Sequence, residues 1–270
     1  MIIDFHTHVF PEKIASATVS ALAKRANIPP YTDGTEAGLL HALSEARADV
    51  AVNLPVLTKP TQFESVAAFA REINEKSYTG ACKIISFAGM HPDVSDVEER
   101  MHELRLMGFR GIKLHPDYQG TFFDDEKYVR TVAAAKAEGL IVVTHSGLDA
   151  AYVGETIKCT PERVLRLLDR VGGYSRLVLA HYGANALFDE VYSLLAGEDV
   201  YFDTAYILHS IGEEQFKRIL DKHGSDRILF ATDSPWQNIA REVEIIKEFK
   251  LGDESEERIF SLNARKLLGI

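Results

Sequence analysis

Short apolar segments alternate along the chain with longer stretches in which apolar residues recur every three or four positions. The apolar segments are rich in Val, Ile, Leu and Phe and do not alternate cleanly with polar residues, as expected for strands covered on both faces. Their starts are spaced by about 32 residues, the length of one strand–helix unit. The predicted strands lie at residues 2–5, 48–54, 83–90, 110–115, 140–145, 176–181, 200–205 and 227–233.

Amphipathic stretches between these segments predict helices. Residues 65–74, 96–108 and 128–139 have helical spacing, and Gly108 and Gly139 are suited to end two of these helices. Thr160 and Pro161 precede another apolar stretch and predict an N-cap followed by proline in the first helical turn.

Eight strand–helix units in one chain predict an α/β fold, a (β/α)8 TIM barrel formed by a single domain of residues 1–270. A doubly wound open sheet is the alternative, but the chain has no Gly-rich phosphate-binding turn after its first strand. The longest connection, residues 9–47, contains a Pro pair and an Asp-Gly turn in residues 27–36, so it cannot be one continuous helix. This connection is either a lid or wall of a substrate site or a plain insertion.

Composition limits the class of partner. Thirty basic and forty acidic side chains give a net charge of −10, which argues against binding to nucleic acid because such binding relies on Lys and Arg at phosphates. A small anionic substrate, which needs only one or two cations, remains possible. The two cysteines, Cys82 and Cys159, indicate a reducing compartment rather than a disulfide framework. With no long apolar segment and no signal-peptide pattern at the start, we expect a soluble cytoplasmic protein.

Histidines gather where the predicted strands end, which is where barrel enzymes carry their active sites. Five of the ten histidines stand at such ends, another follows the third strand, and strand eight ends in an aspartate. His41, His102 and His223 lie in helical or loop stretches typical of solvated histidines, and the role of His209, after strand seven, stays open. The residues at or next to strand ends are His6, His8, His91, His115, His145, His181 and Asp233.

This pattern indicates a metal site. His6 and His8 lie on one face of a strand because side chains alternate with a period of two. Each histidine taken alone is explained by packing, but the set together favours a divalent cation. Imidazole and carboxylate ligands suit Zn²⁺ first, and also Mn²⁺, Fe²⁺ or Co²⁺. Asp4 shares the face of the two histidines, where it either orients a ligand ring or is buried and paired lower in the barrel.

Lys113 points into the barrel on the same face as His115. An ammonium beside a dication is unfavourable unless it is paired or loses its proton. One interpretation is a lysine carbamate that bridges two metals. The other is a lysine that pairs with Asp233 or with a substrate carboxylate.

Several ordered motifs resemble those of the amidohydrolase superfamily, and most closely its amidohydrolase-2 branch of aminocarboxymuconate-semialdehyde decarboxylase-like enzymes and lactonases. The resemblance spans nearly the whole chain. The motifs are DFHTH at 4–8, GFRGIKLHP at 108–116, THSG at 144–147, LAHYG at 179–183, ATDSPW at 231–236 and FSLNARKLLG at 260–269.

This resemblance implies a ligand set. His6, His8, His145 and Asp233 would bind the catalytic metal, and His181 would assist catalysis or bind a second metal. The IKLHP segment is similar to the dihydroorotase strand that carries a carboxylated lysine, which favours two metals and a carbamate on Lys113. The amidohydrolase-2 branch consists mostly of one-metal enzymes, so the sequence leaves the number of metals open.

The leading function is hydrolysis of a C–N or C–O bond in a small amide, lactone or ester. The metal would lower the pKa of a water molecule, Asp233 would accept its proton, and His181 would stabilise the developing oxyanion. His115, His91 and Trp236 are candidate substrate contacts, and Tyr182, Tyr206 and Arg241 are further candidates.

Two alternatives stand beside hydrolysis. One is a metal-dependent, non-oxidative decarboxylase of a small unsaturated or aromatic acid, with Lys113 as the cation for the carboxylate. The other is a metal-bearing barrel that binds a ligand without turnover. In each case the partner is a small molecule rather than nucleic acid or a membrane, and barrels of this kind often form homo-oligomers.

Overall fold

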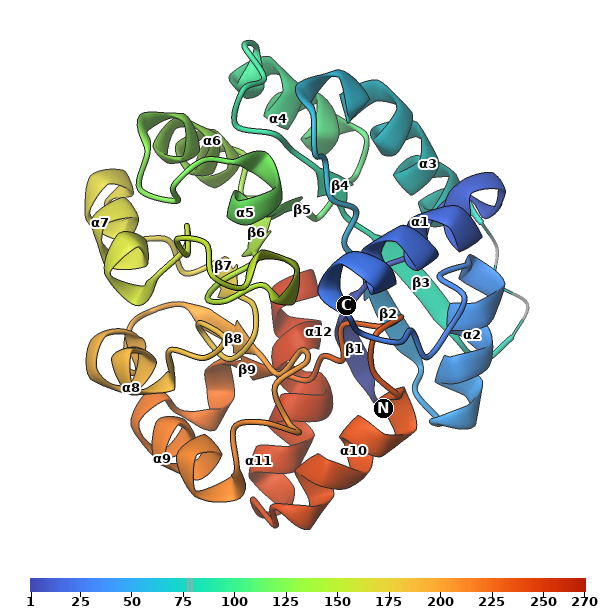
Figure 1. Ribbon diagram of the computed structural model, residues 1–270, viewed down its shortest axis with the longest axis vertical. Helices are drawn as coiled ribbons and strands as arrows, with labels where there is room; N and C mark the ends of the chain where they lie inside the picture. Colours follow the sequence, from blue (N-terminus) through green and yellow to red (C-terminus); the bar gives the residue numbers. More distant parts are fainter. Residues whose placement is uncertain (77, 79) are drawn as a thin grey trace.

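Parallel strands form a ring inside a circle of helices in the computed structural model, which describes residues 1–76, 78 and 80–270 (Figure 1). One sheet has the strand order β1-β2-β3, and the other runs in order from β4 to β9. The strands are β1 (Ile3–Thr7), β2 (Val50–Asn53), β3 (Lys83–Ser86), β4 (Ala88–Gly89), β5 (Gly111–Leu114), β6 (Ile141–Thr144), β7 (Leu177–Leu179), β8 (Tyr201–Asp203) and β9 (Ile228–Leu229).

Two local features join the sheets into a barrel. The third predicted strand is interrupted at Phe87, so that β3 pairs with β2 while β4 pairs with β5. On the other side, the backbone N–H of Phe5 donates to the carbonyl of Phe230 (2.9 Å), and that of Asp233 donates to the carbonyl of His6 (2.8 Å). These bonds connect β1 with the segment after β9, and the predicted (β/α)8 barrel is confirmed.

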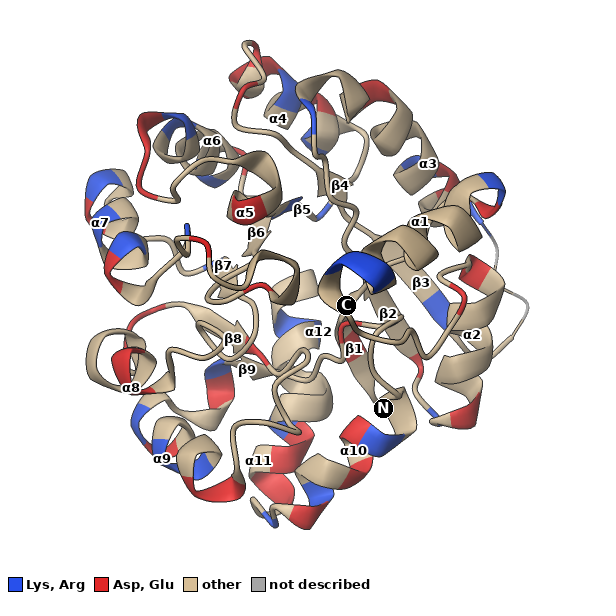
Figure 2. Cartoon of the chain, viewed as in Figure 1, with Lys and Arg blue, Asp and Glu red and all other residues tan. Residues whose placement is uncertain are grey.

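Helices cover the outside of the ring. Figure 2 shows that Lys, Arg, Asp and Glu lie mainly on these outer helices, as expected for faces that contact water. The α-helices are α1 (Glu12–Ala26), α2 (Glu36–Glu45), α3 (Phe63–Glu75), α4 (Val97–Leu106), α5 (Pro116–Gln119), α6 (Glu126–Ala137), α7 (Pro161–Val171), α8 (Phe188–Glu190), α9 (Glu213–His223), α10 (Ile239–Glu248), α11 (Asp253–Glu257) and α12 (Asn263–Leu268). Single turns of 3₁₀ or π helix are η1 (Pro60–Gln62), η2 (Ala150–Tyr152), η3 (Val191–Leu195), η4 (Ser225–Arg227) and η5 (Arg258–Leu262).

The predicted helix ends are confirmed. Thr160 caps α7, where its side chain accepts a hydrogen bond from the backbone N–H of Arg163. Gly108 and Gly139 follow α4 and α6 with φ of 84° and 66°, a left-handed conformation that glycine adopts without strain. Among the described residues, no helix has the length and apolar character to cross a membrane.

The long first connection contains two helices. Residues 27–35 separate α1 from α2 without regular helix, as the Pro pair and the Asp-Gly turn predict. Helix α1 reaches from the rim toward the middle of the ring in Figure 1 and contacts η2. This position makes α1 a wall over the mouth of the barrel, which favours the wall over a plain insertion.

His223 is buried on α9 rather than solvated, which corrects the prediction from its helical context. Its ring stacks on Phe202 with centroids 3.9 Å apart, and its Nδ1 accepts the backbone N–H of Gly197. Burial lowers its pKa from 6.5 to about 4. The unfolded chain therefore binds more protons than the folded chain between these values, and we expect stability to fall by about 3 kcal/mol as the pH drops from 6.5 to 4.

The variant His223→Asn tests this pH dependence, because its amide oxygen can still accept from Gly197 but does not titrate in this range. Urea unfolding between pH 4 and 7 is expected to give a flatter dependence for this variant than for the wild type. His41→Asn is the control, since His41 is exposed. Equal slopes in the wild type and His223→Asn would contradict the assignment.

Candidate metal centre

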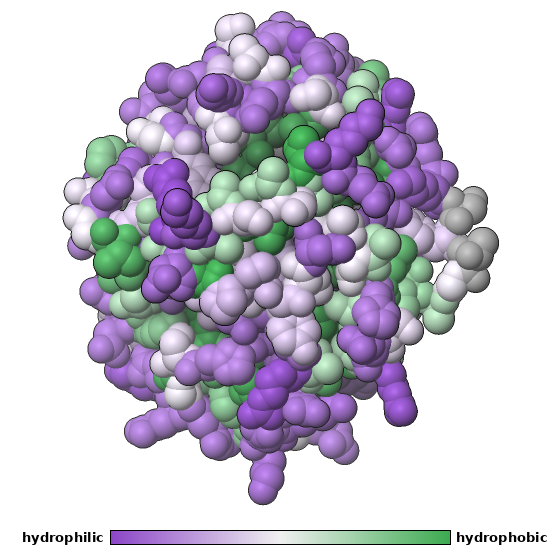
Figure 3. Space-filling view, turned by 45° about the vertical axis from the view of Figure 1, so that its right-hand side comes forward, coloured by the Kyte–Doolittle hydropathy of each residue, from purple (hydrophilic) through white to green (hydrophobic). Residues whose placement is uncertain are grey.

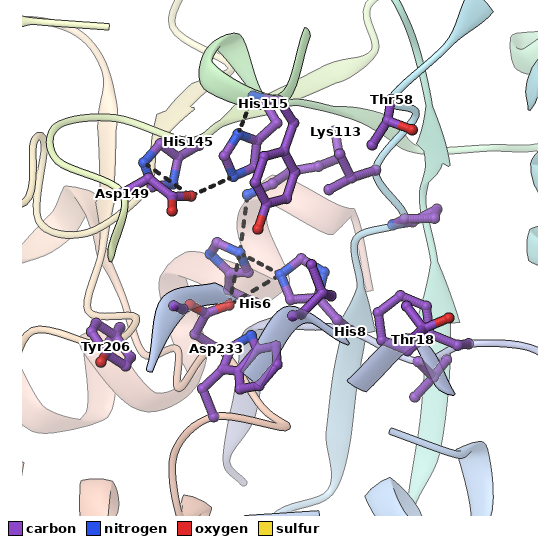
Figure 4. A pocket seen from close by; sticks show the side chains of 18 of the residues that line it. His6, His8, Thr18, Thr58, Lys113, His115, His145, Asp149, Tyr206 and Asp233 are labelled. Atoms are coloured by element: carbon purple, nitrogen blue, oxygen red, sulfur yellow. Dashed lines mark hydrogen bonds and ion pairs between the residues drawn. The ribbon is translucent and has the colours of Figure 1, made fainter. Parts of the chain in front are cut away.

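The carboxyl ends of the strands surround a cavity of about 520 Å³. β1 contributes His6 and then His8, β5 contributes Lys113, and Asp233 follows β9. Figure 4 shows these side chains pointing toward one another. The structure thus brings together residues that lie more than two hundred positions apart in the sequence.

His6 and His8 are held in orientations that present nitrogen lone pairs to one point. The Nδ1 of His6 lies 2.9 Å from a carboxylate oxygen of Asp203, and the Nδ1 of His8 donates to the carbonyl of Leu54 at 2.8 Å. Since both acceptors need a proton on Nδ1, each Nε2 carries a lone pair when its ring is neutral, as a metal ligand must be. These Nε2 atoms lie 3.2 Å apart, and Asp233 Oδ1 lies 3.0 Å from that of His8.

This arrangement fits a divalent cation. Two lone pairs and a carboxylate oxygen repel one another unless a positive charge lies between them. Burial lowers the pKa of His6 well below its ordinary value, with Lys113 as the next cause, so His6 stays neutral as a ligand must. His6, His8 and Asp233 therefore form a group that can hold one metal ion.

Lys113 supplies the positive charge next to this group. Its buried ammonium donates to the Nε2 of His6 at 3.0 Å. Burial lowers the pKa of Lys113 to about 8, against the opposing effects of nearby carboxylates, first Asp203 and then Asp233. A lysine so poised can serve as an ammonium or, after loss of its proton, as a nucleophile toward CO₂, so both interpretations of Lys113 fit this geometry.

A second group of potential ligands lies on the other side of the cavity. His181 donates from Nδ1 to the carbonyl of Ala205, and its Nε2 then accepts from the Nδ1 of His145 at 2.9 Å. The Nε2 of His145 is left with a lone pair, and it is buried without a hydrogen-bond partner. It forms a possible metal-binding group with His115 and Asp149.

His145 therefore lies outside the group of His6, His8 and Asp233 in this structure, and its role as a fourth ligand there stays a prediction. The carboxylate of Asp117 lies 3.8 Å from the Nε2 of His145, with one oxygen unpartnered. Burial raises the pKa of Asp117 to about 6, and the nearby Asp149 adds to the shift. His145 is thus a candidate ligand in two groups: the predicted one with His6, His8 and Asp233, and the one with His115 and Asp149.

Several residues of the site have strained backbone conformations. His181, Tyr206 and Asp233 have φ of 60°, 65° and 64°, a region that side chains other than glycine rarely adopt. Such strain persists where the surrounding structure imposes it, typically at functional sites. It turns these three side chains toward the cavity, which all three line.

Asp203 and Asp149 are site residues that no sequence motif predicted. One oxygen of Asp203 binds the His6 ring, and the other accepts the backbone N–H groups of His181 and Ala205. Asp4 does not orient a ligand ring: it accepts hydrogen bonds from Thr232 and from the backbone of His6, lower in the barrel. The only sequence feature that could have indicated the role of Asp203 is the presence of a carboxylate in a short apolar strand.

Replacing Asp203 by Asn is expected to weaken the affinity for a divalent cation by about 10- to 100-fold, because the orienting hydrogen bond to His6 loses its charge. Competition between the protein and a chromophoric chelator measures this affinity. Asp199→Asn, at an exposed position nearby, is the matched control. An unchanged affinity in Asp203→Asn would show that Asp203 does not support the metal centre.

The remaining candidates divide into two sets. His115, Trp236 and Tyr206 line the cavity. His91 does not: it is buried, and its Nδ1 accepts the backbone N–H of Asp93. Tyr182 and Arg241 are also absent from the lining. Tyr182 stacks on Phe216 in the core, and Arg241 pairs with glutamates on the exposed face of α10.

Histidine and carboxylate groups at the strand ends of a barrel are typical of proteins that hold a divalent cation at the mouth of the barrel, and this chain has that arrangement. The family model for amidohydrolases, Amidohydro_2, matches residues 3–270. The chain therefore belongs to the amidohydrolase family, a family of metal-dependent enzymes, as the motifs predict. No curated protein matches the chain.

Solved structures with the same fold include decarboxylases and a protein provisionally named a hydrolase. The chain resembles 5-carboxyvanillate decarboxylase from Novosphingobium aromaticivorans, with bound manganese, at 15% identity, a TM-score of 0.73, and coverage of 100% of this chain and 97% of that one. It resembles dihydroxybenzoic acid decarboxylase from Polaromonas, also with manganese, at 15% identity, a TM-score of 0.70, and coverage of 99% and 96%. A protein from Pseudomonas putida provisionally named a 2-pyrone-4,6-dicarboxylic acid hydrolase has 16% identity, a TM-score of 0.67, and coverage of 99% and 97%.

Proposed function

We propose that this protein is a metal-dependent hydrolase that cleaves a C–N or C–O bond in a small, uncharged amide, lactone or ester. The observation that carries the proposal is the convergence of two imidazole lone pairs and the Asp233 carboxylate on one point of the cavity. His6, His8 and Asp233 would hold the cation, with His145 as a further predicted ligand. A divalent cation at that point lowers the pKa of water toward neutrality and polarises a carbonyl oxygen.

Asp233 is positioned to move the proton. Its Oδ1 faces His8 and His6, at 3.0 and 3.6 Å. Its side chain also lines the cavity. A carboxylate in this place accepts a proton from the attacking water and returns it to the leaving group.

His181 and Lys113 are the candidates for stabilising negative charge. The bond from His181 Nδ1 to Ala205 fixes the ring, and its Nε2, which accepts from His145 Nδ1 in this structure, would have to gain a proton and exchange that bond for one to the reacting carbonyl. Lys113 reaches the same region with its ammonium. Both side chains are buried, where a hydrogen bond to a developing oxyanion is stronger than in water.

The charges of the cavity favour an uncharged substrate. Among the described residues that line it, Lys113 is the only Lys or Arg, and it is balanced by Asp149 and Asp233. A substrate with one or more carboxylates would find a single cation besides the metal. An ester, lactone or amide requires no further cation.

Decarboxylation is the second candidate, and Lys113 is the observation that favours it. An ammonium beside the metal-binding group is placed to bind a carboxylate or phenolate oxygen. Decarboxylases are also among the proteins that share this fold. Under this alternative the substrate is a small unsaturated or aromatic acid.

A substrate panel separates the candidates. The protein is loaded with Zn²⁺ or Mn²⁺ and incubated with lactones, esters, amides and aromatic acids, and both acid release and CO₂ release are recorded. Hydrolysis without CO₂ release is expected. CO₂ release from the acids alone would replace this proposal by decarboxylation, and inactivity on the whole panel would favour a barrel that binds a ligand without turnover.

A further inference from the structure

The cavity continues past the metal-binding group into an uncharged extension between α1 and α3, which we call the apolar arm. Figure 4 shows Thr18 and Thr58 beyond His8, on the side away from His145, Asp149 and Tyr206. The arm is lined by Phe10, Ile14, Thr18, Val56, Val66 and Phe69. It is therefore continuous with the site where the reaction is proposed.

The two helices present matching rows of side chains to the arm. On α1 the cavity-lining residues Ile14, Thr18 and Leu22 are four positions apart, so they form one line along the helix. On α3 the lining residues Val66 and Phe69 are three apart and likewise share a face. The walls of the arm are thus two helix faces that remain largely apolar but are not packed against each other.

An unfilled apolar surface of this kind needs a partner. Ile14 is 50% exposed although it faces the cavity. In the space-filling view of Figure 3, hydrophobic side chains lie in a recess surrounded by hydrophilic ones. Covering such a surface with an apolar group is favourable in proportion to the area removed from water.

The arm offers little to a charged or strongly polar group. The charged lining residues, Lys113, Asp149 and Asp233, belong to the end of the cavity that holds the metal-binding group (Figure 4). The Oε1 of Gln62 is already occupied, since it accepts the backbone N–H groups of Thr58 and Lys59. An occupant of the arm therefore gains mainly from apolar contact, with the Thr18 hydroxyl and the Gln62 amide nitrogen as the polar groups beside it.

We propose that the substrate carries an alkyl tail that occupies the apolar arm while its hydrolysable ester, lactone or amide group lies at the metal-binding group. This inference rests on the proposed hydrolytic function and assigns the substrate to a chemical class, the medium-chain acyl esters, lactones or amides. The continuity of the arm with the site fixes the direction of the tail. The volume of about 520 Å³ is in the range of pockets that enclose ligands of this size.

Binding of alkanoates to the wild-type protein tests the tail without requiring catalysis. Isothermal titration calorimetry with sodium butanoate, hexanoate and octanoate, on metal-free and on Zn²⁺-loaded protein, gives the dissociation constants. Each added methylene is expected to tighten binding about three- to fourfold in both forms, or on the order of a hundredfold from butanoate to octanoate. Affinity independent of chain length would overturn the proposal.

Variants on both walls locate the tail. Val66→Trp on α3 and Thr18→Phe on α1 fill the arm and are expected to weaken octanoate binding at least tenfold while butanoate binding changes less than twofold. Ala68→Trp and Ser20→Phe place the same side chains on exposed positions of the same helices and should leave both constants unchanged. Equal losses for butanoate and octanoate in the arm variants would show that the tail does not lie there.

The outcome for the arm is separable from the outcome for the hydrolase proposal. Chain-length dependence in metal-free protein, together with no turnover of octanoyl esters, decanolactones or octanamides, would leave the arm in place and refute hydrolysis. Turnover of acetyl and octanoyl esters with equal kcat/KM, together with flat alkanoate affinities, would leave hydrolysis in place and refute the tail.

Discussion

Replacing Asp233 by Asn is expected to lower kcat/KM by about three orders of magnitude while the protein stays folded and binds a divalent cation. The amide keeps an oxygen that can face the cation, but it cannot accept the proton of the attacking water. Proton transfer by a positioned side chain contributes about 10²- to 10⁴-fold to a rate. Steady-state hydrolysis of the best substrate from the panel, with metal content determined on the same sample, gives the result.

Asparagine is the suitable substitution because of the backbone at this position. Asp233 has a φ of 64°, which Asn tolerates and Ala adopts only with strain. Asp233→Ala therefore combines loss of the carboxylate with backbone strain and is the weaker test. Asp189→Asn, on an exposed carboxylate, is the control. Near-normal turnover in Asp233→Asn with metal retained would show that another group accepts the proton.

The fold could be predicted because the way each strand or helix is buried determines the pattern of apolar residues within that segment. Strands covered on both faces are short apolar runs, and helices covered on one face have a period near 3.6, so eight alternations give the barrel. The break at Phe87 was not predictable, since residues 83–90 form one apolar run and only the pairing of β3 with β2 and of β4 with β5 divides them.

The metal-binding group could be predicted in part. His6 and His8 are two residues apart on a strand, and this local spacing already places both rings on one face. The tautomers of these rings depend on Asp203 and on the carbonyl of Leu54, which are close only after folding. For His223 the local pattern was misleading, because its helical context predicts a solvated ring whereas the ring stacks on Phe202.

The apolar arm had no signature in the sequence. Ile14 and Leu22 have the spacing of residues that pack against a core, and nothing local distinguishes a helix face that meets the barrel from one that lines a cavity. Only the position of α1 over the barrel mouth separates the two (Figure 1). The residues that bind the reacting group are thus easier to predict than those that select the substrate, because the former depend on strand ends and the latter on how connections fold back.

Removing the metal with a chelator is expected to abolish turnover, and adding Zn²⁺ or Mn²⁺ is expected to restore it. Without the cation, the lone pairs of His6 and His8 have only the ammonium of Lys113 beside them, and nothing lowers the pKa of water. Elemental analysis of protein purified without chelator or a metal-binding tag gives the number of ions per chain. Activity that survives complete metal removal would refute the hydrolytic proposal.

We expect about one ion per chain, held by His6, His8 and Asp233. The chemical state of Lys113 distinguishes one ion from two. A carbamate on its Nζ would bridge two ions, whereas an ammonium would repel a second ion and remain available to substrate. Lys113→Met should therefore leave the metal content at one and lower turnover. A fall from two ions to one in Lys113→Met, together with a CO₂ adduct in the wild type, would instead establish a two-metal centre. Two ions that persist in Lys113→Met would place the second one at His115, His145 and Asp149, where the unpartnered Nε2 of His145 already faces two carboxylates.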